Sequence, residues 1–289
     1  MPKKNIKLAK HSGFCYGVKR AVETVKKLKA QNPDKDVFIL GELIHNSHVI
    51  QELEALGIKT IYELPEKGSG ICVIRSHGAS PEIFEQITDA GFELVDLTCP
   101  DVKKVQKKAI QLVQEGYFLI IVGKAEHPEV IAIKASAQLF GENISVVSDV
   151  FQLKQIENKI KEHKKVGVVV QTTQRITTLN PIIEYLNIIA QEIVVANTIC
   201  ASTTLRQSEA EELAEESDLM IVVGSKKSAN TTHLAEILRD ISKTIHIEDD
   251  KELETYKNII LDANNIAITA GASTPETVIQ NVINKLKGE

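Results

Sequence analysis

Short hydrophobic runs rich in Ile and Val alternate along this chain with amphipathic stretches of helix length. A short apolar run bounded by turn residues is typical of a strand buried on both faces, and regular alternation with helices predicts a parallel sheet covered by helices. The longest runs, 117–122 and 166–170, fall far short of the ~20 residues that span a bilayer. The pattern therefore predicts an α/β protein without a membrane-spanning segment.

The alternation repeats three times, and this repeat is the main feature of the sequence. In each repeat an apolar strand runs into a cysteine at which a helix begins, in segments 6–28, 93–113 and 192–214. A second strand ends in a glycine and a polar turn, at Gly41, Gly123 and Gly224. A third strand, polar turn and helix follow in segments 70–87, 165–186 and 265–283.

Each repeat predicts a small βαβ domain with a parallel sheet, and we place the domains at 13–98, 99–199 and 200–289. The third repeat ends on a helix with no strand after it, whereas the chain begins with a strand. We therefore expect residues 5–10 to pair into the third sheet, so that segment 1–12 completes the third domain and the domains close around a pseudo-threefold axis. Because loops at the carboxyl ends of parallel strands build sites, this ring would bring the three cysteine turns to one centre.

Three of the four cysteines occupy the same place in the repeat. Cys15, Cys99 and Cys200 each stand at a strand-to-helix turn, whereas Cys72 lies inside the apolar run ICVIR and is expected to be a small core residue. Helix N-termini lower the pKa of a thiol and favour the thiolate that binds metals. The repeat therefore predicts one site with three thiolate ligands.

Two metal groups fit three thiolates. Zinc stays open with three cysteines and a histidine, although the local Cys-x-x-Cys spacing of zinc ribbons is absent from the sequence. A site assembled from three domains suits a larger group, so we favour a 4Fe–4S cluster at the centre of the ring. Three cysteines leave one iron without a protein thiolate, and this iron can act as a Lewis acid toward a substrate oxygen.

Polar turns at the other strand ends predict an anion pocket. Imidazole, hydroxyl and amide groups donate hydrogen bonds, and helix N-termini add backbone N–H groups. The turns carry such groups at His45, His77, His127, Ser228, Asn230 and Ser273. This set suits a diphosphate without a Walker-type glycine loop, a motif that the sequence lacks, as it lacks G-x-G-x-x-G. The alternative that each residue only stabilises its turn stays open.

Glu129 and Thr172 are candidates for the chemistry. Glu129 follows His127 and Pro128 at the start of a helix, where a carboxylate is also common because of the helix dipole. In an enclosed site the pKa of a carboxyl group can rise, and the group can then supply a proton. Thr172, in the turn QTT, is suited to hydrogen-bond a substrate hydroxyl or to cap the helix. Four histidines have weaker contexts and are expected on the surface or in packing: His11, His163, His233 and His246.

The composition is that of an ordinary globular protein, and it narrows the possible partners. The net charge is −5 and Lys and Arg are scattered, so we expect no binding to nucleic acids or membranes. The N-terminus lacks the continuous apolar region of a secretory signal, so we expect a cytoplasmic location. In that reducing compartment four cysteines are not expected to form disulfides.

A series of short motifs runs through the chain from residue 11 to residue 280. They are HSGFCYGVKRAVE, GELIHN, IRSHG, DLTCPDV, HPEV, QTT, NTIC followed by RQ, GSKKSAN and AGASTPE. In order and spacing this series resembles the 4-hydroxy-3-methylbut-2-enyl diphosphate reductase family (IspH/LytB). The resemblance implies an oxidoreductase at the end of the non-mevalonate isoprenoid pathway. Two electrons and two protons would remove the allylic hydroxyl as water, giving isopentenyl and dimethylallyl diphosphates.

Carried over by position, the resemblance implies that Cys15, Cys99 and Cys200 ligate the cluster. It implies that Glu129 delivers protons, that His127 is part of the catalytic group, and that Thr172 helps to place the substrate hydroxyl. The diphosphate would be held by His45, His77, His127, Ser228, Asn230 and Ser273. An external electron donor such as ferredoxin or flavodoxin is also implied. The chain departs from the family after HPEV, where IAIKASA stands in place of a Gly-containing stretch.

Two other functions stay open on the residues. A cluster-dependent hydro-lyase would use an open iron to remove water without net reduction. A non-catalytic zinc or redox module would use the cysteines alone, with the histidine turns purely structural. Consumption of reductant with substrate separates the reductase from the hydro-lyase, and iron–sulfur absorption would exclude zinc.

Overall fold

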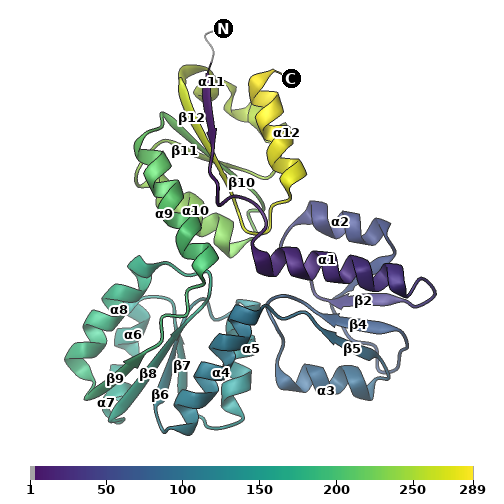
Figure 1. Cartoon of the computed structure of the whole chain (residues 1–289). Helices are drawn as coiled ribbons and strands as arrows, with labels where there is room; N and C mark the ends of the chain where they lie inside the picture. Colours follow the sequence, from purple (N-terminus) through teal and green to yellow (C-terminus); the bar gives the residue numbers. More distant parts are fainter. Residues whose placement is uncertain (1–3, 289) are drawn as a thin grey trace. The chain divides into compact units, whose positions relative to one another are not determined.

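The computed structural model describes residues 4–288 and contains three four-stranded sheets, one for each repeat (Figure 1). The first repeat comprises α1 (Tyr16–Gln31), β2 (Val37–Leu40), α2 (Ser47–Ala55), β3 (Ile58–Ile61), β4 (Ile71–Ile74), α3 (Pro81–Asp89) and β5 (Glu93–Asp96). The second comprises α4 (Pro100–Gln114), β6 (Phe118–Val122), α5 (Pro128–Gln138), β7 (Ile144–Val147), α6 (Val150–Gln155), α7 (Glu157–Lys161), β8 (Lys165–Val170), α8 (Ile176–Ile189) and β9 (Glu192–Val195). The third comprises β1 (Asn5–Leu8), α9 (Ala201–Glu215), β10 (Leu219–Val223), α10 (Ala229–Arg239), β11 (Thr244–Ile247), the 3-10 helix η1 (Asp250–Tyr256), α11 (Lys257–Asp262), β12 (Asn265–Ala270) and α12 (Glu276–Lys287).

The three sheets share one topology. Their strand orders are β5-β4-β2-β3, β9-β8-β6-β7 and β1-β12-β10-β11, and all neighbouring strands are parallel. In each sheet the strand that leads into a cysteine lies at one edge, next to the strand that precedes the third polar turn. Each cysteine turn therefore has the same neighbour, which is the turn at the carboxyl end of β12, β4 or β8.

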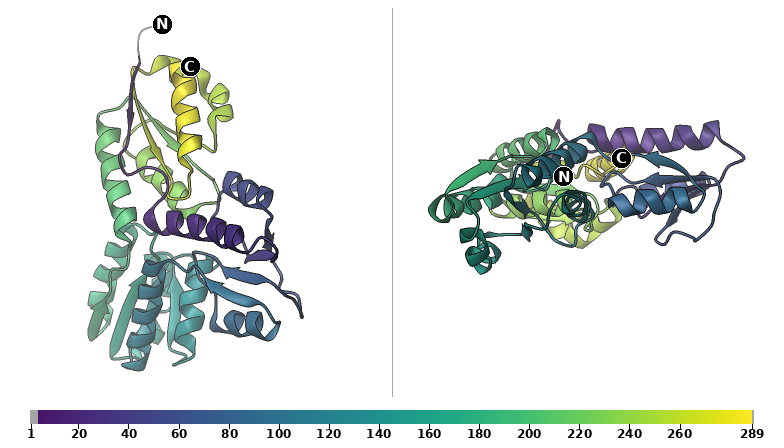
Figure 2. Two further views of the ribbon diagram at one scale, coloured as in Figure 1. Left: turned by 45° about the vertical axis from the view of Figure 1, so that its right-hand side comes forward. Right: turned by 90° about the horizontal axis from the view of Figure 1, so that it is seen from below.

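The N-terminal strand belongs to the third sheet, as its sequence position predicts. Asn5 lies opposite Asn265 and Leu8 opposite Ile268, and the N–H of Ala9 continues the ladder to the carbonyl of Ile268 at 2.8 Å. In Figure 2 the purple β1 runs beside the yellow-green β12. The predicted pairing of residues 5–10 is thereby confirmed for the paired strand, while residues 1–3 of the predicted segment 1–12 lie outside the described residues.

The chain forms two compact units. One holds the sheet of β1, β10, β11 and β12 together with α2, and the other holds the two remaining sheets. The three-domain boundaries that the repeats suggest stay a prediction. Within residues 4–288, no helix combines the length and the apolar character needed to cross a bilayer.

Helices cover both faces of the sheets, and the third sheet shows how the sequence achieves this. Side chains alternate across a strand, so Ile266 and Ile268 of β12 face one core, with α12, while Ala267 faces another, with α9 and α10. Both faces are buried, which explains why the strands are continuous apolar runs rather than alternating ones. The small alanine faces the side on which α9 packs.

Candidate active site

The three candidate cysteine ligands occupy equivalent turns. Each stands at a helix start, before α1, at the N-cap of α4 and before α9. Each backbone N–H donates to a carbonyl in the turn after the neighbouring strand: Cys15 to Ala272 (3.2 Å), Cys99 to Ser76 (2.9 Å) and Cys200 to Thr172 (3.0 Å). The repeat therefore produces three cysteine turns with the same backbone tether, all with half-buried thiols.

Cys72 differs from these three cysteines in its position in the fold and in its burial. It lies within β4, is fully buried in the core and packs near Ile87 and Phe92. Burial raises the pKa of its thiol to about 11, because the thiolate would lose its hydration. The predicted core role of Cys72 is confirmed.

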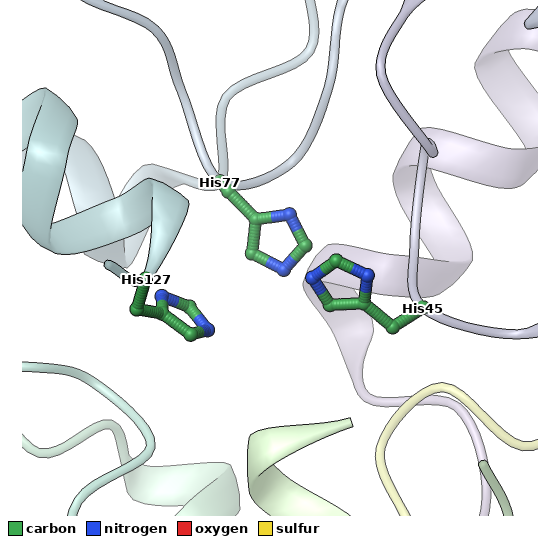
Figure 3. A group of neighbouring side chains, drawn as sticks. All are labelled: His45, His77 and His127. Atoms are coloured by element: carbon green, nitrogen blue, oxygen red, sulfur yellow. The ribbon is translucent and has the colours of Figure 1, made fainter. Parts of the chain in front are cut away.

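His77 and His127 face each other at two strand ends. Their rings meet edge to face, with centroids 5.5 Å apart, and one ring nitrogen of each lies within 4.8 Å of the other. Figure 3 draws both side chains and also labels His45. His127 is the N-cap of α5, where its Nδ1 accepts the N–H of Glu129 at 3.2 Å. A neutral His127 then carries its proton on Nε2, which can donate to an anion.

The other predicted anion-binding residues lie in the unit that contains β10 and β12. His45 precedes Asn46, the buried N-cap of α2, and its carbonyl accepts the Ser273 hydroxyl at 3.5 Å. Ser228 is the N-cap of α10, and its Oγ accepts the N–H of Thr231. Ser228, Asn230 and Ser273 are all buried. These polar groups therefore lie at helix starts and strand ends, where backbone N–H groups favour the binding of an anion.

Asn230 connects two of these turns. Its Oδ1 accepts the N–H of Ala272 at 3.4 Å, and its Nδ2 donates to the hydroxyl of Thr203 at 3.3 Å. Ala272 is also the residue whose carbonyl accepts the N–H of Cys15. The amide of Asn230 thus stabilises the turn beside the Cys15 turn, in addition to any ligand that it contacts.

Glu129 and Thr172 form a buried pair. The carboxylate of Glu129, 1% exposed, accepts both the N–H and the hydroxyl of Thr172, at 2.7 and 2.8 Å. Burial raises the pKa of Glu129 to about 7; the two hydrogen bonds from Thr172 lower it, and the charge of Asp101 raises it further. A carboxyl group with this pKa can hold a proton near neutral pH and release it to a neighbouring base.

A family model described as LytB protein matches residues 6–287. This chain belongs to the LytB family. The 4-hydroxy-3-methylbut-2-enyl diphosphate reductase of Geobacter sulfurreducens is 40% identical to it over 283 residues, which cover 98% of this chain and 96% of that relative.

Two solved structures share the LytB fold. One is the (E)-4-hydroxy-3-methyl-but-2-enyl diphosphate reductase described as the terminal enzyme of the non-mevalonate pathway; it is 36% identical, with 99% of this chain and 100% of that chain covered and a TM-score of 0.73. The E-1-hydroxy-2-methyl-but-2-enyl-4-diphosphate reductase from Plasmodium falciparum is 29% identical, with 98% and 88% covered and a TM-score of 0.88. The predicted α/β class with three similar parallel sheets is confirmed.

The remaining histidines of this LytB chain have structural surroundings. His233 is buried in α10, and His246 is buried in β11 with its Nε2 2.9 Å from the carbonyl of Gly224. Burial lowers the pKa of His246, against the opposing effect of that carbonyl. His11 is exposed, and the ring of His163 packs against Phe118. All four agree with the expected surface or packing roles.

The stretch IAIKASA, where this chain departs from the LytB pattern, is helical. It continues α5 without a break from Pro128, and Ala132, Ile133 and Ala137 are buried in it. The departure therefore leaves His127 at the N-cap and Glu129 in the first turn.

The sequence assigned no role to Arg206, which belongs to the RQ motif, or to Glu209; both lie on α9 and contact the segment before Cys15. A signal was present, because the corresponding position of the other repeats, six residues after the cysteine, is occupied by Ala21 and Val105. A charged residue at a position that is otherwise apolar is a departure from the repeat that periodicity alone does not explain.

Proposed function

We propose that this LytB chain reduces 4-hydroxy-3-methylbut-2-enyl diphosphate, removing its allylic hydroxyl as water and forming isopentenyl and dimethylallyl diphosphates. This reaction ends the non-mevalonate pathway. The observation that carries the proposal is the 40% identity to a reductase of that name along 98% of the chain. The equivalent backbone hydrogen bonds of Cys15, Cys99 and Cys200 support it, because they give the three candidate ligands the same position in their turns.

Cys15, Cys99 and Cys200 are proposed to hold a 4Fe–4S cluster. The donor set fits such a group, because three half-buried cysteines stand at equivalent helix starts and cysteine thiolates are the usual ligands of iron–sulfur clusters. The buried Cys72, with a pKa of about 11, is unsuited to be a fourth ligand. When bound, the cluster supplies electrons and one iron without a protein thiolate, which can act as a Lewis acid.

The diphosphate is proposed to bind to His45, His77, His127, Ser228, Asn230 and Ser273. The Nδ1 contact of His127 directs its Nε2 proton outward as a donor. Ser228 adds a hydroxyl at the start of α10, where the helix dipole favours negative charge. In this proposal the chain neutralises the diphosphate with hydrogen-bond donors rather than with a metal ion.

Glu129 is proposed to be the proton donor and Thr172 the residue that places the substrate hydroxyl. A hydroxide is a poor leaving group, so the oxygen must receive a proton as the C–O bond breaks. With a pKa of about 7, Glu129 is partly protonated at neutral pH. Its hydrogen bond with the Thr172 hydroxyl provides a route for that proton toward the substrate oxygen.

The electrons are proposed to come from an external carrier such as ferredoxin or flavodoxin, in the cytoplasm. The hydro-lyase and the zinc-module alternatives are not favoured, because the relatives and both solved structures are named as reductases of an allylic diphosphate.

Anaerobic iron and sulfide quantification, followed by turnover with a chemical reductant, tests the proposal. We expect four irons and four sulfides per chain, the stoichiometry of the proposed cluster, and consumption of reductant only when substrate is present. Zinc without sulfide would indicate the non-catalytic module. Dehydration of the substrate without consumption of reductant would indicate the hydro-lyase.

A further inference from the structure

The segment that leads into Cys15 is the longest of the three equivalent connections. Residues 9–14 lie between the end of β1 and Cys15, whereas residues 97–98 and 196–199 lie before Cys99 and Cys200. A longer connection has more backbone groups that no strand or helix pairs. Their hydrogen-bond partners must therefore come from elsewhere.

Arg206 supplies the donors. Its side chain is 4% exposed, and its Nη1 donates to the carbonyls of His11 at 2.7 Å and Ala270 at 2.5 Å. Its Nη2 donates to the carbonyl of Gly13 at 2.9 Å. The planar guanidinium thus joins the segment before Cys15 to the end of β12, a geometry that the point charge of a lysine cannot reproduce.

Glu209 supplies the acceptors, one helical turn further along α9. Its Oε1 accepts the N–H of Lys10 at 2.8 Å, and its Oε2 accepts the N–H of His11 at 2.7 Å. Residues three apart lie on one face of a helix, so Arg206 and Glu209 present opposite charges to one backbone segment. The N–H groups and carbonyls of this segment are both paired with charged groups, which makes stronger hydrogen bonds than neutral partners do.

The other repeats show that packing does not require this charge. The corresponding residues, Ala21 and Val105, are fully or almost fully buried and apolar. A buried guanidinium loses hydration free energy, and replacing it with an apolar residue of similar volume is often neutral or stabilising. Arg206 is therefore suited to a role in the position of the Cys15 turn rather than in the strength of the core.

We propose that Arg206 and Glu209 form a clamp that positions Cys15 as a cluster ligand. The inference rests on the proposed function, because it assigns Cys15 to the cluster. The clamp acts through the backbone of residues 10–13, so Arg206 and Glu209 are both positioning residues. Helix α9 begins at the residue after Cys200, so the helix that follows one proposed ligand holds the turn of another.

Cysteine labelling during chelator-driven loss of the cluster tests the clamp in the full-length, anaerobically purified protein. An iron chelator and iodoacetamide are added together, and mass spectrometry follows Cys15 and Cys99. The ratio of the Cys15 labelling rate to the Cys99 labelling rate corrects for differences between variants in the overall rate of cluster loss. We expect Arg206→Lys and Arg206→Met to raise the Cys15-to-Cys99 ratio by about five-fold or more, the factor for one net hydrogen bond. Glu209→Gln keeps one acceptor oxygen and should raise it less.

Val105→Ala is the matched control, because it removes buried side-chain atoms from the same repeat position beside the Cys99 turn. We expect it to leave the labelling ratio unchanged or to lower it. Should Arg206→Met fail to fold, Arg206→Lys and Glu209→Gln carry the test. An unchanged ratio in the folded variants overturns the clamp.

Hydrogen–deuterium exchange separates failure of the clamp from failure of the proposed function. A wild-type protein without iron and sulfide would overturn the proposed function, and labelling would then have no cluster to follow. Exchange of the amides of residues 10–15 still reports on the clamp. We expect faster exchange in this segment of Arg206→Lys than in wild type, and unchanged exchange would contradict the clamp.

Discussion

The turns of Cys15 and Cys200 have the same backbone tether but different polar anchors. Around Cys15, the guanidinium of Arg206 and the carboxylate of Glu209 hold the incoming segment. At Cys200 the tether is the carbonyl of Thr172, whose N–H and hydroxyl bind Glu129. Glu129 has a pKa of about 7, so this second turn is connected to a group that titrates. One repeat position is therefore anchored by Arg206 and Glu209 on α9, and another has a titratable anchor, Glu129.

The Cys99 turn shows a third solution, in which side chains close in sequence add to the shared backbone tether. Asp96 accepts the N–H and hydroxyl of Thr98, at 2.9 and 2.5 Å, and pairs with Lys103 at 2.6 Å. Burial opposes ionisation of Asp96, but its hydrogen bonds and the Lys103 charge lower its pKa below the usual value. A short connection can be stabilised by nearby residues, whereas the longer connection to Cys15 depends on a helix almost two hundred residues away in sequence.

Removal of a cluster ligand should have the largest effect on cluster content and turnover. This effect should be the same at each of the three cysteine turns. We expect Cys15→Ser, Cys99→Ser and Cys200→Ser each to lose the cluster and to reduce turnover below detection. Cys72→Ser should keep both, because Cys72 is a core residue of β4. Iron, sulfide and turnover measured anaerobically check this expectation. A Cys72→Ser protein without a cluster would show that the ligand assignment is wrong.

Glu129→Gln should separate the titratable anchor from the chemistry. The amide keeps the size of the side chain and one acceptor for Thr172, but it cannot protonate a leaving group. We expect full cluster content and substrate binding with at least a ~10²-fold loss of turnover. Single-turnover kinetics under anaerobic conditions measure the loss. Turnover close to that of wild type would remove Glu129 from the mechanism and direct attention to His127.

The same residue should make stability depend on pH. The pKa of Glu129 is about 7 in the folded chain and 4.5 in an unfolded one, so the folded state binds more protons between these values. Stability is therefore greatest at the low end of this window and falls as the pH rises through it, by about 2 kcal/mol between pH 5 and pH 8. Denaturant unfolding of cluster-free wild type and Glu129→Gln measures this contribution. Equal pH dependence in both proteins would contradict it.

Arg206→Lys provides the contrast, because a guanidinium keeps its charge throughout this pH range. Its effect on stability should be the same at pH 5 and at pH 8. A difference between these pH values that matches the Glu129 contribution would show that the two anchors are coupled rather than distinct.

Gly13→Ala should give the smallest effect, a loss of stability that arises in the Cys15 turn. Gly13 has a φ of +76°, and an added Cβ would lie 3.0 Å from Cδ1 of Ile279. Gly116 has a similar φ of +80° but no atom within 4 Å of an added Cβ. Both substitutions carry the backbone strain, so we expect Gly13→Ala to cost about 1 kcal/mol more than Gly116→Ala. Equal unfolding midpoints in denaturant would show that the turn absorbs the extra methyl group.

The sequence by itself determined the fold and the positions of the candidate ligands. Buried strands and amphipathic helices are encoded in neighbouring residues, so the three repeats and the core position of Cys72 could be predicted from the sequence. The pairing of β1 with β12 could be predicted because the third repeat lacked a strand that the N-terminus supplied. The family motifs then pointed to the residues around each strand end.

Only the tertiary structure decided which side chains hold those turns. The pKa of Glu129 depends on its burial and on Thr172, and residues 129 and 172 meet because β6 and β8 are neighbours in one sheet. Arg206 reaches His11 and Gly13 because β1 joins the edge of β12 and α9 packs across that sheet. The repeat pattern specifies which face of an element is buried. It does not specify which polar partner a buried backbone group will find, because that choice depends on segments far apart in sequence that folding brings together.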